Sequence, residues 1–115
     1  MATVHEVGLV WDELQQHLVD VVNGIQDARE IRTKAFARAE ILGVELARLL
    51  KGHEFLPRYV LLGLWNAARS VANGAEYLQD PRPALELAET LETTYQLILL
   101  GECHSDRQPG IPRIR

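Results

Sequence analysis

Three side chains in the N-terminal segment could together bind a metal ion. Glu13 and His17 are four residues apart, and Asp20 follows three residues later. On an α-helix these spacings place all three on one face, and helical bundles build metal sites from such carboxylate–imidazole sets. Those sites also need ligands from other helices, and the later segments offer no Glu or His at a core position. A solvated acidic face therefore explains these residues better, and we expect neither a metal ion nor another cofactor.

The adjacent residues Cys103 and His104 could form a pair in which the imidazole activates the thiol as a nucleophile. Adjacent residues rarely reach the required geometry, and no Gly-rich loop accompanies them. A nucleophile also needs a preformed oxyanion site, which a mobile tail cannot hold. We therefore expect the pair to be incidental and its thiol to be exposed and oxidisable.

Three glutamates in the C-terminal half could act as general acids. Glu86, Glu89 and Glu92 would do so only if buried, because burial favours the protonated carboxyl. Their spacing places them opposite the apolar stripe of Leu87 and Leu91, so we expect them to face water. P-loop, Rossmann, nucleophile-elbow and zincin motifs are all absent from the sequence. The sequence therefore indicates a protein that is not an enzyme.

The composition indicates a single globular domain. A chain of 115 residues is long enough for a core but short for two domains. Its single cysteine excludes an internal disulfide and fits a reducing compartment, and no secretory signal pattern is apparent, so we expect a cytoplasmic protein. The apolar stretch Leu56–Leu64 is interrupted by Pro57, Arg58 and Gly63, and is too short to cross a membrane.

The charge distribution argues against nucleic-acid binding. The formal net charge is -4, whereas binding to a phosphate backbone requires a basic surface. The basic residues of segment 27–52 are interleaved with acidic ones, and segments 1–26 and 79–101 are acidic. This pattern predicts neighbouring antiparallel helices with complementary charges.

Apolar periodicity and stop signals predict four helices, at about residues 3–23, 27–51, 57–79 and 83–100. Asn23-Gly24 marks the end of the first helix, because both residues tolerate the left-handed conformation that ends helices. Asp27 and Glu30 have the capping-box spacing that begins the second. Alternating apolar runs are lacking, so a sheet is not expected.

The predicted helices pack into one four-helix bundle-like domain over residues 1–101, and the fold class is therefore all-α. Residues 102–115 are rich in Pro and Gly and lack periodicity, which predicts a mobile, extended or disordered tail. On the second helix we expect Ile41 and Val44 to widen the inward-facing stripe. On the fourth we expect Tyr95 to line the inner face.

The third predicted helix is apolar on nearly every side. From Phe55 to Leu78 the charged residues are Arg58, Arg69 and Glu76. One face consists of small residues that would let another backbone approach closely: Val60, Gly63, Ala67 and Gly74. A helix that is apolar all round must be covered all round, and a chain of this size has little material for that cover. We therefore expect a second chain to supply part of it, in a homodimer.

Large aromatic and apolar side chains around this helix are the candidates for a protein interface. Tryptophan and tyrosine combine a large apolar area with a polar group, and they often anchor protein–protein contacts. The candidates are Tyr59, Leu62, Trp65, Trp11 and Phe55. The alternative for each residue is that it fills the core.

Two segments resemble a helical hairpin found in short all-α pseudomonad proteins of unassigned function. These segments are Lys34–Leu50 and Arg58–Ala75, about 40 residues in all. The resemblance rests on Ala35, Ala39, Glu40, Leu42, Ala67 and Ala68. It implies no catalytic residue, and suggests a small intracellular regulatory protein.

Three classes of function follow from the sequence. The leading one is a small non-enzymatic regulator that binds another protein through its apolar, aromatic helical surface. In a concrete form it would be an antagonist that covers the dimerisation surface of a transcriptional regulator. The alternatives are a structural, self-associating bundle subunit and a bundle that binds a metal or small ligand.

Overall fold

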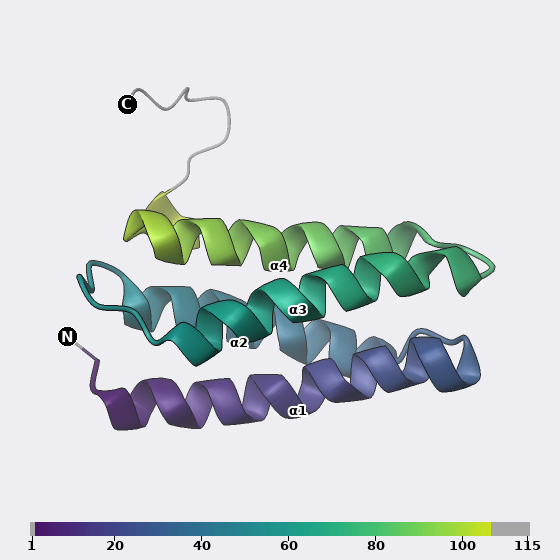
Figure 1. The fold of residues 1–115 in the computed structure, drawn as a ribbon, viewed down its shortest axis with the longest axis horizontal. Helices are drawn as coiled ribbons and strands as arrows, with labels where there is room; N and C mark the ends of the chain where they lie inside the picture. The colour runs from purple at the N-terminus through teal and green to yellow at the C-terminus, as the bar shows by residue number, and fades with distance from the viewer. Residues whose placement is uncertain (1, 107–115) are drawn as a thin grey trace.

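Four α-helices make up most of residues 2–106, the part of the chain that the structure, a computed structural model, describes. Their bounds are α1 Val4–Ala28, α2 Thr33–Leu50, α3 Arg58–Gly74 and α4 Arg82–Leu100. Consecutive helices run antiparallel (Figure 1), and α1 packs against α2 and α3 while α4 packs against α3 and α2. The described residues contain no strand. The predicted all-α, four-helix fold is thus confirmed, and residues 107–115 of the predicted tail lie outside the described residues.

The first helix continues past its predicted end at Asn23-Gly24 and stops at Ala28. Arg29, with a φ of 52°, takes the left-handed conformation and ends it. Gly24 lies inside α1 and is buried. A side chain there would be crowded, because its Cβ would lie 2.9 Å from Cγ of Arg32. The glycine therefore provides room for a side chain packed on the helix and does not end it.

The second helix begins at Thr33, six residues after the predicted start at Asp27. The expected capping box is wrong, because Asp27 lies within the last turn of α1. The short link between α1 and α2 is tied back to α1 by an ion pair between Arg32 and Asp20. Its position is therefore fixed by a contact between residues distant in sequence, which local capping signals do not report.

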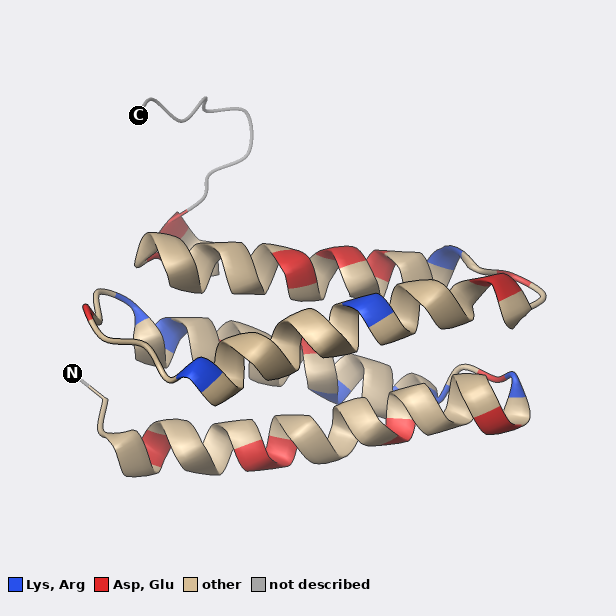
Figure 2. Ribbon diagram, viewed as in Figure 1, with Lys and Arg blue, Asp and Glu red and all other residues tan. Residues whose placement is uncertain are grey.

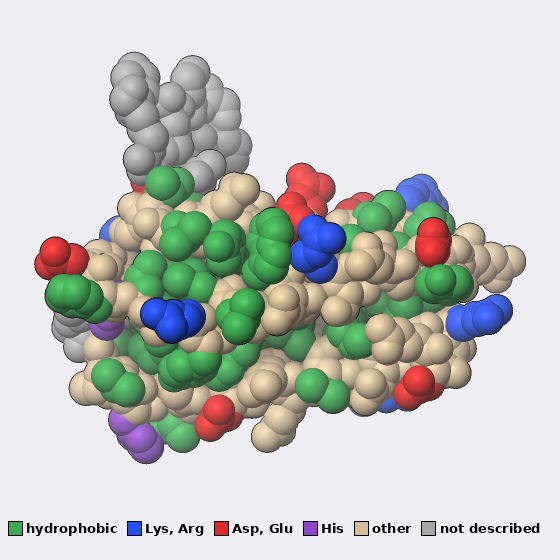
Figure 3. Space-filling model, in the orientation of Figure 1, with side chains coloured by type: hydrophobic (Ala, Val, Ile, Leu, Met, Phe, Trp, Pro, Cys, Tyr) green, Lys and Arg blue, Asp and Glu red, His purple; other side chains and the backbone are tan. Residues whose placement is uncertain are grey.

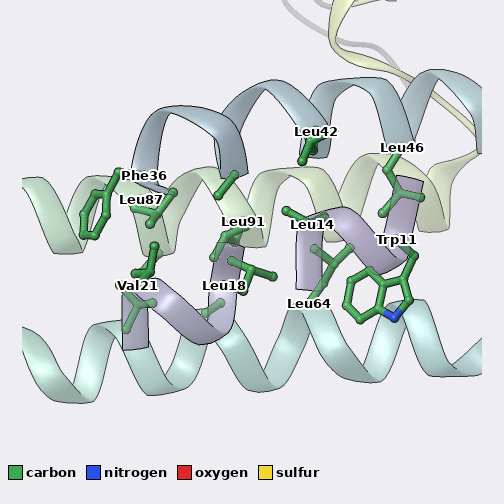
Figure 4. Close-up of a cluster of buried hydrophobic side chains, with 14 of the residues drawn as sticks. Trp11, Leu14, Leu18, Val21, Phe36, Leu42, Leu46, Leu64, Leu87 and Leu91 are labelled. Atoms are coloured by element: carbon green, nitrogen blue, oxygen red, sulfur yellow. The ribbon is translucent and has the colours of Figure 1, made fainter. Parts of the chain in front are cut away.

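The core lies between the four helices and is apolar. Figure 4 shows how side chains from all four meet there. Its largest fully buried side chains are Leu14, Val21 and Ile25 of α1, Leu46 and Leu50 of α2, Val60, Leu64 and Val71 of α3, and Leu87, Leu91, Leu97 and Ile98 of α4. Burial of this apolar surface is the main force that holds the bundle together.

Two positions of α2 depart from the predicted inward face, whereas Tyr95 of α4 packs against the core but is not fully buried. Ile41 and Val44 are 56% and 44% exposed, so they lie on the outside of α2 and do not widen its inner stripe. Tyr95 is only half-buried. The polar residue Thr94 is also buried, and it faces Gly43 of α2: a Cβ at Gly43 would lie at an ordinary contact distance, 3.5 Å, from Oγ1 of Thr94.

The small-residue face of α3 packs on α1 of the same molecule. A Cβ at Gly63 would lie 2.2 Å from Cζ2 of Trp11, and one at Gly74 would lie 2.7 Å from Cγ2 of Ile25. Large α1 side chains therefore fill the space that the glycines leave. The helix ends at Gly74 and continues as a 3-10 turn, Ala75–Tyr77. None of the described helices is both long and apolar enough to cross a membrane.

The residues after α4 fold back onto the bundle as far as Asp106. Gly101, with a φ of 73°, ends α4, and its carbonyl accepts a hydrogen bond from the N–H of Gly52 at 3.2 Å. A second 3-10 turn, His104–Asp106, follows. Lys51 Nζ lies 2.7 Å from Oδ1 of Asp106. The extended tail predicted from Glu102 thus does not begin within the described residues.

Candidate functional site

The carboxylates proposed as metal ligands are paired with arginines of the α2 side. Both oxygens of Glu13 accept from Nη2 of Arg38, at 3.1 and 3.3 Å, and Asp20 pairs with Arg32. These contacts join α1 to α2 and its preceding link, as the complementary charges of the two segments predicted. Among residues 2–106, no group of three or more His, Cys, Asp or Glu side chains is arranged to hold a metal ion.

Cys103 and His104 do not contact each other as nucleophile and base. The Cys103 Sγ is buried and lies 3.2 Å from Oγ of Ser105, whereas the His104 Nε2 lies 3.2 Å from Oγ1 of Thr94. The expectation of an exposed thiol is therefore wrong. Burial lowers the pKa of the His104 imidazole. The His104 contact links the C-terminal turn to α4, whereas the Cys103 contact lies within the turn.

The same turn is stabilised by the carboxylate of Asp106. Its Oδ2 accepts a hydrogen bond from the Cys103 N–H at 2.9 Å, and its Oδ1 pairs with Lys51. The Lys51 and Cys103 contacts lower the pKa of Asp106 to about 2. Because both partners favour the charged carboxylate, the turn is built around an ionised Asp106.

The glutamates of α4 are exposed, as predicted. Glu86, Glu89 and Glu92 are all exposed, and Figure 2 shows acidic positions recurring along α4. None of them takes part in an ion pair within the described part of the chain. They give α4 an acidic outer side, while the charges within α3 are the arginines Arg58 and Arg69.

Four of the five predicted interface residues are exposed together on and beside α3. Phe55, in the link before the helix, is 87% exposed, and Leu62, Tyr59 and Trp65 are 55%, 49% and 42% exposed. These four residues define the α3 surface. Trp11 is 5% exposed and lies against Gly63, so it belongs to the core and not to this surface.

The aromatic side chains of the α3 surface are held in place by neighbours. The Trp65 ring lies 5.6 Å from the ring of Tyr95, and the Arg69 guanidinium lies 5.8 Å from the Trp65 ring centre. Tyr59 meets the buried Trp11 edge to face at 6.4 Å. Rings that are held before binding lose little conformational freedom when a partner covers them. The α3 surface therefore combines exposure with order.

Two shallow depressions flank these side chains. One, of about 280 Å³, lies at the end of the bundle and is lined mainly by apolar side chains, among them Val4, Leu50, Phe55, Leu56 and Tyr59. The other, of about 330 Å³, lies between α3 and α4. Its lining consists of Arg58, Leu61, Leu62, Trp65 and Tyr95. Hydrophobic side chains gather over α3 and the adjoining part of α4 in Figure 3.

Sequence reasoning missed the contribution of α4 to this region. Tyr95 lines the depression beside Trp65, and Leu99, one turn further along α4, is 51% exposed. The signal was present in the spacing of four between these two residues, next to the buried positions Leu91 and Ile98. Assigning them to the α3 side required the pairing of α3 with α4. Other large apolar residues are exposed elsewhere, among them Leu9 and Val19 of α1, and exposed apolar residues are usual on protein surfaces.

The chain matches no protein-family model, no curated protein and no solved structure. Function is therefore inferred from the geometry of its own side chains.

Proposed function

We propose that this protein is a small non-enzymatic regulator that acts in the cytoplasm by binding another protein through the α3 surface. The observation that carries the proposal is the group of exposed apolar side chains on this surface, Phe55, Tyr59, Leu62 and Trp65, of which Tyr59 and Trp65 are held in place by ring contacts. Binding energy in protein interfaces concentrates in a few such anchors. Of the groups considered for chemistry, Glu13 and Asp20 are engaged in ion pairs, and Cys103 and His104 belong to the C-terminal turn, whereas Glu86, Glu89 and Glu92 are exposed.

The charges around the α3 surface indicate the kind of partner that fits. Arg58 and Arg69 flank the apolar side chains, and neither takes part in an ion pair within the described residues. An apolar segment with acidic residues at its margins, such as an amphipathic helix, would satisfy both features. The proposal in its most specific form is an antagonist that covers the dimerisation surface of a transcriptional regulator.

A second candidate is a structural subunit that self-associates, and its support is the apolar area around Leu62 and Trp65. Burying apolar surface contributes about 25 cal/mol per Å², so an apolar helix face favours association with any complementary surface. Here we propose a homodimer as the free form of the protein. A metal-binding bundle has less support, because arginines already satisfy Glu13 and Asp20.

Affinity capture with the tagged full chain tests the regulator proposal. Tyr59→Ala and Trp65→Ala should each lose the captured partner, because removing an aromatic anchor typically costs about 2 kcal/mol or more of binding. Ile41→Ala is the matched control, since Ile41 is a large apolar residue on α2 with 56% exposure. Circular dichroism must first show that each variant is folded.

A second set of variants tests whether the protein acts by chemistry. His17→Ala, His53→Ala and Cys103→Ser should all retain partner capture and biological activity. Loss of activity in one of these folded variants, with partner binding intact, would contradict a purely binding function.

A further inference from the structure

Two rows of side chains lie side by side along the groove between α3 and α4. Leu62, Trp65 and Arg69 form the α3 row, since spacings of three and four place them on one side of the helix. Leu99, Tyr95 and Glu92 form the α4 row by the same spacings. Along the bundle, each row begins with a leucine, continues with an aromatic residue and ends with a charged residue.

The contact between the two rings fixes the relative levels of the two rows. Trp65 faces Tyr95 at 5.6 Å, and the helices run antiparallel (Figure 1). Moving four residues from Tyr95 to Leu99 therefore corresponds to moving back from Trp65 to Leu61, beside Leu62. Moving from Tyr95 to Glu92 corresponds to moving forward to Ala68, beside Arg69. Leu62 thus lies at about the same height along the bundle as Leu99, and Arg69 at about the same height as Glu92.

The charged ends of both rows are available for an outside contact. Glu92 is exposed, and its carboxylate takes part in no ion pair among the described residues. Arg69 lies over the Trp65 ring, and within residues 2–106 it has no carboxylate partner either. The two charges share a level without pairing, so each can meet its counterpart on another molecule.

We propose that a second copy of this chain covers the groove, in a two-fold dimer in which each α3 lies between α3 and α4 of the other copy. Two copies that pack in this way are related by a two-fold axis that runs parallel to the groove, and so to α3 and α4. Rotation about this axis leaves the height of each residue along the helices unchanged. The α3 row of one copy therefore contacts the α4 row of the other copy. Leu62 of one copy then contacts Leu99 of the other, and Arg69 contacts Glu92, each contact occurring twice.

This arrangement makes the homodimer proposed above more specific, because it identifies the groove between α3 and α4 as the dimer interface. It also buries Leu62 and Trp65, which belong to the α3 surface assigned to the partner protein. The copy and the partner therefore compete for the same side chains, a consequence that rests on the proposed function. Phe55, at the end of the bundle before α3, lies outside the two rows, so a partner can begin to bind there before the dimer separates.

The mass of the full chain in solution tests this proposal first. Light scattering after size exclusion should give twice the monomer mass of 13.0 kDa. Leu62→Gln should raise the dissociation constant of the dimer by about tenfold or more, since it places an amide in the apolar centre. Ile41→Gln, at a residue of nearly equal exposure on α2, should leave it unchanged. A dimer whose dissociation constant is below about 100 μM is largely associated at that concentration of protein. A wild-type protein that is monomeric at about 100 μM would therefore overturn the proposal.

Charge reversal gives a test that depends on contacts between molecules. Arg69→Glu and Glu92→Arg each place like charges opposite each other in a homodimer, and each should weaken self-association by about tenfold or more. When the two variants are mixed, every Arg69–Glu92 position again joins opposite charges. Native mass spectrometry should therefore find heterodimers in the mixture and mainly monomers in each separate sample. Homodimers that persist in both variants, or a mixture that stays monomeric, would contradict this arrangement.

These measurements involve no partner protein, so they separate the two proposals. A monomer that still captures a partner through Tyr59 and Trp65 would overturn the dimer and leave the regulator proposal standing. A dimer formed through Leu62, Arg69 and Glu92, with no partner captured, would support the dimer and contradict the regulator proposal.

Discussion

The indole of Trp11 occupies the space that a side chain at Gly63 would need. A Cβ at position 63 would lie 2.2 Å from Cζ2 and 2.3 Å from Cη2 of the ring. This contact brings α3 close to α1, and it leaves Leu62 and Trp65, on other sides of α3, exposed to solvent. The orientation of the α3 surface thus depends on a glycine that is not part of it.

Gly63→Ala should destabilise the protein because the added methyl group must displace the Trp11 ring. Overpacking of this kind costs about 1–3 kcal/mol. Gly8→Ala is the matched control: it lies within α1 with no atom within 4 Å of the added Cβ. There the greater helix propensity of alanine should stabilise by up to about 1 kcal/mol. Urea denaturation midpoints of the two variants should therefore move in opposite directions.

Ala68→Leu should also cost about 1–3 kcal/mol, because position 68 is fully buried between α3 and its neighbours. Ala28→Leu, at the exposed end of α1, should change stability little. The comparison is made by urea denaturation with unchanged m-values as a check on two-state unfolding. Equal shifts in the two midpoints would mean that the inner face of α3 is wrongly placed.

Acid should release the C-terminal turn through Asp106. The pKa of this carboxyl is lowered from 3.8 to about 2 in the folded protein. The stability that the ionised group contributes is therefore fully present above the unfolded pKa of 3.8 and is lost as pH falls toward about 2. Asp106→Asn should lower the Tm at neutral pH and remove this part of the acid dependence. A Tm difference from wild type that stays constant between about pH 5 and pH 2 would contradict the assignment.

Chelation should leave the protein folded. Glu13 and Asp20 are paired with arginines, so no bound metal is required to neutralise them. Treatment with EDTA should leave both the far-UV helical signal and the Tm unchanged. A fall in Tm that zinc or iron reverses would restore the metal-site hypothesis for Glu13, His17 and Asp20.

Apolar periodicity was enough to predict four helices and most of their buried faces, because burial repeats with the period of the helix. It was not enough for the boundary between α1 and α2. Gly24 carries the same local signal as a helix stop, but its actual role is to make room for Arg32, a contact made only in the tertiary structure. The buried Thr94 was missed for the same reason, since its burial comes from packing between helices, where it faces Gly43 of α2.

The candidate surface was predicted in part. Phe55, Tyr59, Leu62 and Trp65 were identified because they share a short segment with little charge. Trp11 is a tryptophan like Trp65 but is buried in the core. Residue type alone therefore does not distinguish an interface residue from a core residue. The α4 row could be assigned only after Trp65 was seen to face Tyr95, since pairing between helices is a property of the packed bundle.

The hydrogen bond between Gly52 and Gly101 brings together the two ends of the segment that contains α3 and α4. This helical hairpin therefore enters and leaves the bundle at one place. Segments whose ends meet can be replaced or inserted with little disturbance to the rest of a fold. The hairpin that carries the α3 surface can thus be exchanged as a module, provided that the replacement keeps the buried side chains of α3 and α4 and the glycines facing Trp11 and Ile25. A single α1–α2 scaffold could in this way support hairpins of different binding specificity.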